Sequence, residues 1–184
     1  MVVGVLAFQG DFAEHIKILD DLKVRSVEVR SSRELSEVDV LIIPGGESTV
    51  MMKFLTETGL DKEIIKRVKS EMPVLGTCAG AILLSDSYLN LLDISVDRNA
   101  YGSQLQSFSD RITIKDIGSI EAAFIRAPII TRVGDDVSVL ASYNENPVLV
   151  QSGLIIAATF HPEVKSESAV HSLLLRSLSS LKVT

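Results

Sequence analysis

The sequence predicts an α/β protein of three layers, in which helices flank an open, mostly parallel central sheet and antiparallel strands are added in the C-terminal half. Short apolar runs alternate with helix-like segments through the first half, and several of these runs end at glycine-rich turns. From about Ile94 onward, this rhythm gives way to a succession of short β-rich pieces. A length of 184 residues suits one domain, so residues 1–184 are expected to fold together.

The parallel part is expected to use strands at 2–8, 25–30, 38–43 and 73–77. Helical spacing follows the first strand, with Asp11 as the expected N-cap. A helix after residues 44–46 is expected to be capped by Ser48 or Thr49, and further helices are expected near 61–69 and 79–85.

The second half is expected to add antiparallel strands, separated by turns at 134–136 and 144–147. A closing helix over 167–181 carries an apolar stripe. The expected strands are 111–117, 120–125, 129–133, 137–142, 148–151 and 154–160.

Composition excludes several classes of function. A net charge of −6 and a pI near 5.1 argue against a nucleic-acid-binding stripe. No apolar run approaches the roughly 18 residues of a membrane span, and the N-terminus does not read as a signal peptide. A single cysteine fits a reducing cytosol, so we expect a cytoplasmic protein.

That cysteine, Cys78, lies in the stretch GTCAG between a strand-like and a helix-like segment. The turn after a strand of an open sheet faces the crevice where ligands bind, and a helix N-terminus favours the reactive thiolate. The flanking Gly76 and Gly80 suit the sharp turn that presents a nucleophile. The alternative is a buried structural cysteine.

A thiolate nucleophile needs a base, and His161 is the best placed of three histidines because it follows an expected strand. Glu163, two residues further on, can orient the imidazole, although His-Pro-Glu could also be a polar turn. His15 and His171 lie on amphipathic helical segments, where solvated or half-buried side chains are expected.

Acyl transfer also needs donors for an oxyanion. The backbone N–H of Ala79 is one candidate, and the Gly45-Gly46 loop after another buried strand is the second. Those glycines could equally serve only to reverse the chain. A phosphate-cradling role is disfavoured, because the Walker lysine is missing and Glu47 would repel phosphate.

Together, PGGES at 44–48, GTCAG at 76–80 and HPE at 161–163 resemble the class I, triad-type glutamine amidotransferases. Four further stretches look like one subfamily, the glutaminase subunit of pyridoxal 5′-phosphate synthase, and the resemblance spans nearly the whole chain. Those stretches are 7–12 with Glu14-His15, 97–102 (DRNAYG), 124–128 (FIRAP) and 159–163 (TFHPE).

The resemblance implies a class I glutamine amidotransferase-like fold and hydrolysis of L-glutamine to L-glutamate and ammonia. Cys78 would attack the side-chain amide, His161 would protonate the departing ammonia, Glu163 would hold His161, and water would cleave the thioester. Gly46 and Ala79 would supply the oxyanion donors. The implied glutamine contacts are Gly46, Glu47, Ser48, Arg98, Ile125 and Arg126.

Arg98 has a physical rationale of its own, because a guanidinium suits a substrate α-carboxylate, although a surface ion pair is the plain alternative. Two departures from the family concern the rim of the site. The segment 85–93 looks shorter than usual, and Ser103 stands where the family often has arginine.

The resemblance also implies a partner, a barrel-shaped synthase subunit in a hetero-oligomeric complex that receives the ammonia internally and makes pyridoxal 5′-phosphate. The chain would then be classed as a hydrolase and, through the complex, as a lyase. It would need no cofactor and no metal. We expect Gln9-Gly10 and Gly45-Gly46 to border one crevice as part of a docking and switching surface.

Three alternatives remain. The first is a glutaminase serving another acceptor, such as a nucleotide or histidine precursor, and the second is a catalytically idle regulatory subunit. The third is a cysteine hydrolase or stress protein of the related open-sheet type. Such a protein would normally place histidine after the nucleophile, where this chain has Ala79.

Overall fold

A computed structural model of the chain describes residues 1–98 and 107–181, with the side chains of 178–181 left aside. Its main sheet has seven strands in the order β2-β1-β3-β4-β11-β10-β9. The first five strands in this order run parallel. Strand β10 pairs antiparallel with β11, and β9 pairs antiparallel with β10. Their bounds are β1 (Val3–Leu6), β2 (Ser26–Val29), β3 (Val40–Ile43), β4 (Val74–Thr77), β9 (Ser138–Tyr143), β10 (Asn146–Ser152) and β11 (Ile155–Ala158).

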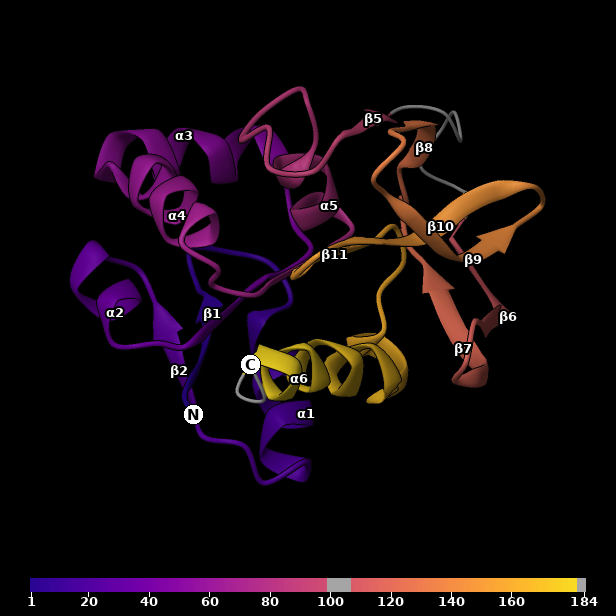
Figure 1. The fold of residues 1–184 in the computed structure, drawn as a ribbon, viewed down its shortest axis with the longest axis horizontal. Helices are drawn as coiled ribbons and strands as arrows, with labels where there is room; N and C mark the ends of the chain where they lie inside the picture. Colours follow the sequence, from indigo (N-terminus) through magenta and orange to yellow (C-terminus); the bar gives the residue numbers. More distant parts are fainter. Residues whose placement is uncertain (99–106, 182–184) are drawn as a thin grey trace.

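Helices cover both faces of this sheet (Figure 1). On one side lie α3 (Ser48–Thr58) and α4 (Leu60–Lys69), with α2 (Ser32–Ser36) and α5 (Ala79–Leu84) packed into the same core. On the other side, α1 (Phe12–Asp21) and α6 (Ala169–Leu181) lie next to each other. The predicted three-layer α/β fold is confirmed.

Strand β3 shows why a continuous apolar run forms this sheet. Leu41 and Ile43 belong to the core under α3 and α4, whereas Val40 and Ile42 belong to the core under α1 and α6. Because successive side chains of a strand point to opposite faces, a strand covered on both sides must be apolar at every position.

Two smaller sheets complete the C-terminal half, β5 (Ile94–Asp97) with β8 (Ile129–Val133) and β6 (Phe108–Ile114) with β7 (Gly118–Phe124). One expectation here is wrong, because 154–160 does not simply extend an antiparallel set. A turn at Gly153, with φ of 54°, folds β11 back against β10 and inserts it parallel to β4. This insertion gives the parallel sheet a fifth strand.

Two cap assignments also need correction. Asp11 occupies the N-cap position of α1, but its side chain makes no capping hydrogen bond. Helix α3 is capped by Glu47, whose side chain accepts from the backbone N–H of Thr49 at 3.3 Å, rather than by Ser48 or Thr49. None of the described helices is long and apolar enough to span a membrane.

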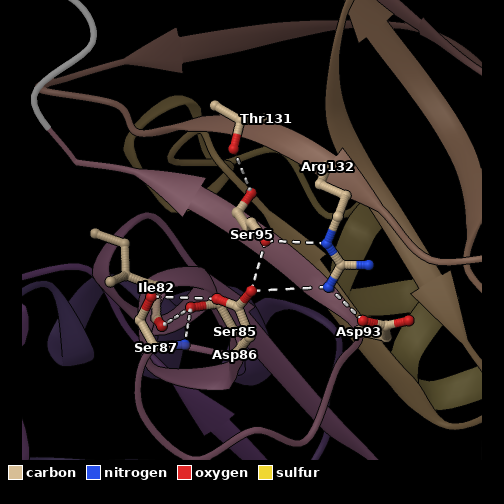
Figure 2. A network of polar contacts seen from close by, with 8 residues as sticks. All are labelled: Ile82, Ser85, Asp86, Ser87, Asp93, Ser95, Thr131 and Arg132. Carbon is tan, nitrogen blue, oxygen red and sulfur yellow. Dashed lines mark hydrogen bonds and ion pairs between the residues drawn. The ribbon is translucent and has the colours of Figure 1, made fainter.

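The segment 85–93, expected to be a shortened loop, is held in place by polar contacts (Figure 2). The guanidinium of Arg132 on β8 lies 2.5 Å from Asp93 Oδ1 and 3.7 Å from Asp86 Oδ2. Ser95 donates from Oγ to Asp86 Oδ2 at 2.5 Å and accepts from Arg132 Nε at 3.1 Å. Both ends of the segment are therefore tied to the β5–β8 pair.

Candidate active site

The candidate site lies at one edge of the main sheet. Strands β1, β3, β4 and β11 are neighbours and parallel, so their carboxyl ends lie side by side. The segments that leave these ends contain Asp11, Gly45-Gly46, Cys78 and His161. This edge is where ligands bind in open α/β sheets.

Cys78 sits between β4 and α5 with φ of 48° and ψ of −104°. A side chain in this left-handed region is strained, and such strain persists only where the surroundings enforce it, often at functional sites. A Cβ at Gly80 would lie 2.0 Å from the carbonyl oxygen of Ile43, so only glycine allows so close a turn. The thiol is 6% exposed, and its Sγ lies 3.8 Å from the carbonyl oxygen of Ile125.

His161 and Glu163 form a short, buried hydrogen bond. Nδ1 of His161 lies 2.7 Å from Oε1 of Glu163, whose side chain is fully buried. The backbone N–H of His161 donates to Ala123 at 2.8 Å and so ties the segment to β7. The ring is thereby oriented, with its second nitrogen left free for the thiol.

Asp11 is a second carboxylate on the same ring nitrogen, which the sequence analysis assigned only as a helix cap. Its Oδ2 lies 3.2 Å from Nδ1 of His161, and its side chain is 39% exposed. The hydrogen bond from His161 lowers the pKa of Asp11, against a smaller opposing effect of burial.

These contacts decide the charge of the imidazole. Burial by itself would lower the pKa of His161, but hydrogen bonds with Asp11, Cys78 and Glu163 outweigh burial and raise the pKa to about 12. Burial raises the pKa of Glu163, and its partner His161 offsets part of that rise. His161 is therefore protonated at neutral pH and able to act as a proton donor.

The two glycine loops beside the triad residues touch each other. Gln9 donates from Nε2 to the carbonyl oxygen of Glu47 at 2.9 Å. A Cβ at Gly10 would lie 1.7 Å from the carbonyl oxygen of Gly45, and one at Gly45 would lie 2.4 Å from Cε1 of His161. The loops after β1 and β3 thus pack on each other and on the imidazole.

The implied glutamine contacts spread around this centre. Ser48 is buried at the start of α3, and Gly46 has φ of 147° and packs near Met51 and Gln9. Ile125 offers its carbonyl oxygen to the thiol, as described above. Ala79, the first residue of α5, is buried.

Charged side chains occupy the exposed part of the site. Arg98 pairs with Glu47 at 3.5 Å and donates to the hydroxyl of Tyr88 at 2.8 Å. Hydrogen bonds with Thr49 lower the pKa of Glu47, and Arg98 and Arg126 add smaller effects in the same direction. The ion pair that was the plain alternative for Arg98 thus exists, and its partner is another implied substrate residue. Ser103 and most of the stretch 97–102 lie outside the described residues.

His15 and His171 were expected to be solvated or half-buried, and this expectation is wrong. Both are 0% exposed, and Nδ1 of His15 lies 2.8 Å from Nε2 of His171. Each ring faces the other helix instead of water because α1 and α6 pack together on one face of the sheet. The sequence did contain one signal for His15. It follows Asp11, the N-cap residue of α1, by four positions, and this spacing places Asp11 and His15 on the same face of the helix.

Among the described residues, one group has the ligand spacing of a metal site. Ligand atoms of Asp11, His161 and Glu163 all lie within 4.8 Å of one another, a cluster that the sequence analysis did not foresee. Nδ1 of His161 can share a proton with Glu163 or bind a cation, and the 2.7 Å separation suits the shared proton.

Comparison with known proteins agrees with this geometry. The family model of the SNO glutamine amidotransferase family matches residues 5–180. The chain therefore belongs to the SNO glutamine amidotransferase family.

Several relatives that match nearly the whole chain are named pyridoxal 5′-phosphate synthase subunit PdxT. The relative from Caldicellulosiruptor saccharolyticus is 46% identical over 96% of this chain and 97% of its own length. The relative from Thermotoga maritima is 44% identical over 95% and 98%. A crystal structure described as a glutamine amidotransferase superposes with a TM-score of 0.92 at 41% identity, covering 96% of this chain and 98% of its own.

The comparisons correct one expectation. Classing the chain as a lyase is wrong, because the matching family is one of glutamine amidotransferases, and a glutaminase subunit is a hydrolase.

Proposed function

We propose that this chain is the glutaminase subunit of a pyridoxal 5′-phosphate synthase. It hydrolyses L-glutamine to L-glutamate and ammonia and passes the ammonia to a synthase subunit for vitamin B6 biosynthesis. The observation that carries the proposal is the group formed by strained Cys78, His161 and buried Glu163 at the carboxyl edge of the sheet. Residues 1–184 work as one glutamine amidotransferase domain, and a cytoplasmic location fits the single cysteine.

In the first half-reaction, the thiolate of Cys78 attacks the side-chain carbonyl carbon of glutamine. The resulting tetrahedral oxyanion accepts hydrogen bonds from the N–H groups of Gly46 and Ala79. Protonated His161 then donates its proton to the amide nitrogen, the C–N bond breaks, and ammonia leaves a thioester on Cys78.

In the second half-reaction, His161 takes a proton from water, which attacks the thioester carbon. The C–S bond breaks, and glutamate leaves with a new carboxylate. Glu163 holds the ring in one orientation through both halves and stabilises its positive charge.

Charge at the rim can recognise the α-amino acid end of glutamine. Arg98 suits the α-carboxylate, and Glu47 suits the α-ammonium, so the substrate would exchange the existing 3.5 Å ion pair for its own complementary charges. Ser48, Ile125 and Arg126 complete the proposed contacts.

Delivery to a partner follows from the chemistry of ammonia. Free ammonia in neutral water is mostly ammonium, which is not a nucleophile, so the product must reach its acceptor without meeting solvent. We assign the acceptor site to a barrel-shaped synthase subunit in a hetero-oligomeric complex.

The docking and switching surface is assigned to the loops at Gln9-Gly10 and Gly45-Gly46. They contact each other through the Gln9–Glu47 hydrogen bond, and Gly45 packs on His161. A partner that moves either loop would therefore move the imidazole or the oxyanion donor at Gly46.

The proposal is tested by measuring ammonia release from glutamine with and without the matching synthase, and cofactor formation in the coupled mixture. We expect low release from the isolated chain and a large increase when the synthase is added. Full glutaminase activity in the isolated chain would contradict the switching surface. No cofactor formation from glutamine in the complex would contradict the assigned function.

The other readings explain less. A glutaminase for another acceptor does not account for relatives that share one synthase name over about the whole chain. An idle subunit has no need for a cysteine with a strained backbone, such as Cys78 with φ of 48°, beside the protonated imidazole of His161. A hydrolase of the stress-protein type would need histidine where Ala79 stands.

A further inference from the structure

Behind the triad residues lies a second, fully buried polar layer. Nε2 of His15 lies 3.5 Å from Oε2 of Glu163 and 3.1 Å from Oγ1 of Thr77, the residue before Cys78. Nδ1 of the same ring lies 2.8 Å from Nε2 of His171. His15 thus reaches both the strand that carries the nucleophile and the carboxylate that orients the base.

We propose that His15 is a positioning residue of the reaction. Held by His171 in the tautomer with its proton on Nε2, it keeps Glu163 in place as a carboxylate. The inference rests on the proposed function for its meaning, since it concerns the same reaction.

The accounting of hydrogen bonds on Glu163 leads to this tautomer. Oε1 is satisfied by His161, but Oε2 is buried and has no hydrogen-bond partner within normal limits among the described residues. A buried carboxylate oxygen without a donor is costly. Nε2 of His15 is a ring nitrogen that faces this oxygen, and a proton there satisfies it after a movement of a few tenths of an ångström.

The tautomer of the second ring follows from this choice. If Nε2 of His15 carries the proton, Nδ1 is an acceptor, and Nε2 of His171 must be the donor across the 2.8 Å contact. Nδ1 of His171 then carries no proton; this buried atom makes no hydrogen bond of normal geometry among the described residues, and the arrangement forgoes the interaction with the Glu167 backbone, which favours a proton on the ring.

Both rings are neutral in this arrangement. Burial lowers the pKa of His15 well below its ordinary value, and the charges of His171 and His161 act in the same direction. Burial also lowers the pKa of His171 to about 4, against a smaller opposing effect of the Glu167 backbone. As a neutral donor, His15 stabilises the negative charge of Glu163 at Oε2 and leaves the ion pair between Oε1 and His161 unchanged.

The test compares variants in the complex with the synthase. His15→Phe keeps most of the ring volume and removes the donor, and His15→Gln restores an N–H. We expect His15→Phe to lower kcat roughly 10- to 100-fold with KM nearly unchanged, because the buried carboxylate of Glu163 loses the donor that faces its Oε2 at 3.5 Å. His15→Gln should recover part of the loss. Ile18→Val, a buried change one turn along α1, is the control for helix packing.

A second readout does not need glutamine. The rate at which iodoacetamide alkylates Cys78 is followed against pH, and we expect its midpoint to rise in His15→Phe. A less charged Glu163 stabilises the positive charge of His161 less well. The titratable groups that can affect this midpoint are the imidazole of His161 with its two carboxylate partners, Asp11 and Glu163, and His171 on the far side of His15.

The third measurement uses the unaltered protein. Nitrogen-15 NMR of the histidine rings should show His15 with its proton on Nε2. A proton on Nδ1 of His15, or a folded His15→Phe with unchanged kcat and alkylation midpoint, would overturn the inference. If the unaltered chain releases no ammonia with synthase but the midpoint still shifts, the proposed function fails and the positioning role stands.

Discussion

Gly45 shows how much a single residue decides at this site. Its backbone is not in the left-handed region, so alanine would be acceptable by conformation alone. A Cβ there would nevertheless lie 2.4 Å from Cε1 of His161 and 3.0 Å from Oδ2 of Asp11. The missing side chain makes room for the imidazole.

Replacing Gly45 by alanine should therefore cost activity more than stability. Displacing His161 from its partner by about 1 Å is expected to lower kcat on the order of 100-fold. Ammonia release with the synthase and the melting temperature are measured together. Gly59→Ala is the control for activity: its Cβ would meet nothing within 4 Å, and the φ of 71° at this position makes alanine cost stability rather than ammonia release. Equal loss of activity in both variants would contradict this reading of Gly45.

At this scale, the sequence indicated some residues and missed others. Cys78, His161 and Glu163 stand in short local patterns, GTCAG and HPE, which can be read without knowing the fold. His15 and His171 are 156 positions apart, and helical periodicity cannot show that two polar side chains will face each other. Asp11 was assigned to the right position but to the wrong hydrogen bond.

At the scale of elements, α1 links the two loops to the buried layer. Asp11 at its start contacts His161, and His15 one turn later faces Glu163. The helix begins directly after Gln9-Gly10, which are in contact with the loop after β3. A displacement of this helix would therefore move Asp11 against His161 and His15 against Glu163.

The polar network around Arg132 gives a prediction for the segment 85–93. Arg132→Gln should speed hydrogen exchange in that segment and at the N–H of Gly134, which donates to the backbone carbonyl of Asp93 at 2.8 Å. The melting temperature should change little, because the network is exposed and screened by solvent. Arg33→Gln, an exposed arginine on α2, is the control. Unchanged exchange would show that Arg132 does not hold the segment.

The elements were predicted best where apolar runs are long. The strands and helices of the first half were expected near their observed places, but five-residue α2 and four-residue β5 were missed. Only Leu35 is buried in α2 and only Ile94 in β5, so neither element forms the continuous apolar run that marks a short strand such as β3. The parallel pairing of β11 depends on which strand it meets, and local sequence does not contain that information.

For the whole molecule, two neutral buried histidines predict acid sensitivity. The unfolded chain binds protons at His15 and His171 below about pH 6.5, whereas folded His171 remains neutral until its pKa of about 4. The stability that these two neutral rings contribute is therefore complete above pH 6.5 and is lost as pH falls toward 4. Each such proton contributes a slope of about 1.4 kcal/mol per pH unit.

Urea unfolding at a series of pH values between 7 and 4 measures this slope. In His171→Phe, the free energy of unfolding should depend less steeply on pH. The difference in slope should correspond to about one proton, because only the unaltered chain takes up a proton at residue 171 when it unfolds. The carboxylates common to both proteins cancel in the comparison. Equal slopes would mean that His171 is already charged in the folded state.

The proposed glutaminase activity requires that the sulfur of Cys78, the single cysteine of the chain, is the nucleophile. The direct measurement is mass spectrometry of the chain after incubation with a glutamine-mimicking electrophile in the presence of the synthase. We predict a single adduct, located on Cys78 and formed much more slowly in His161→Gln. An unmodified Cys78, or an adduct formed at the same rate without the imidazole, would contradict the account.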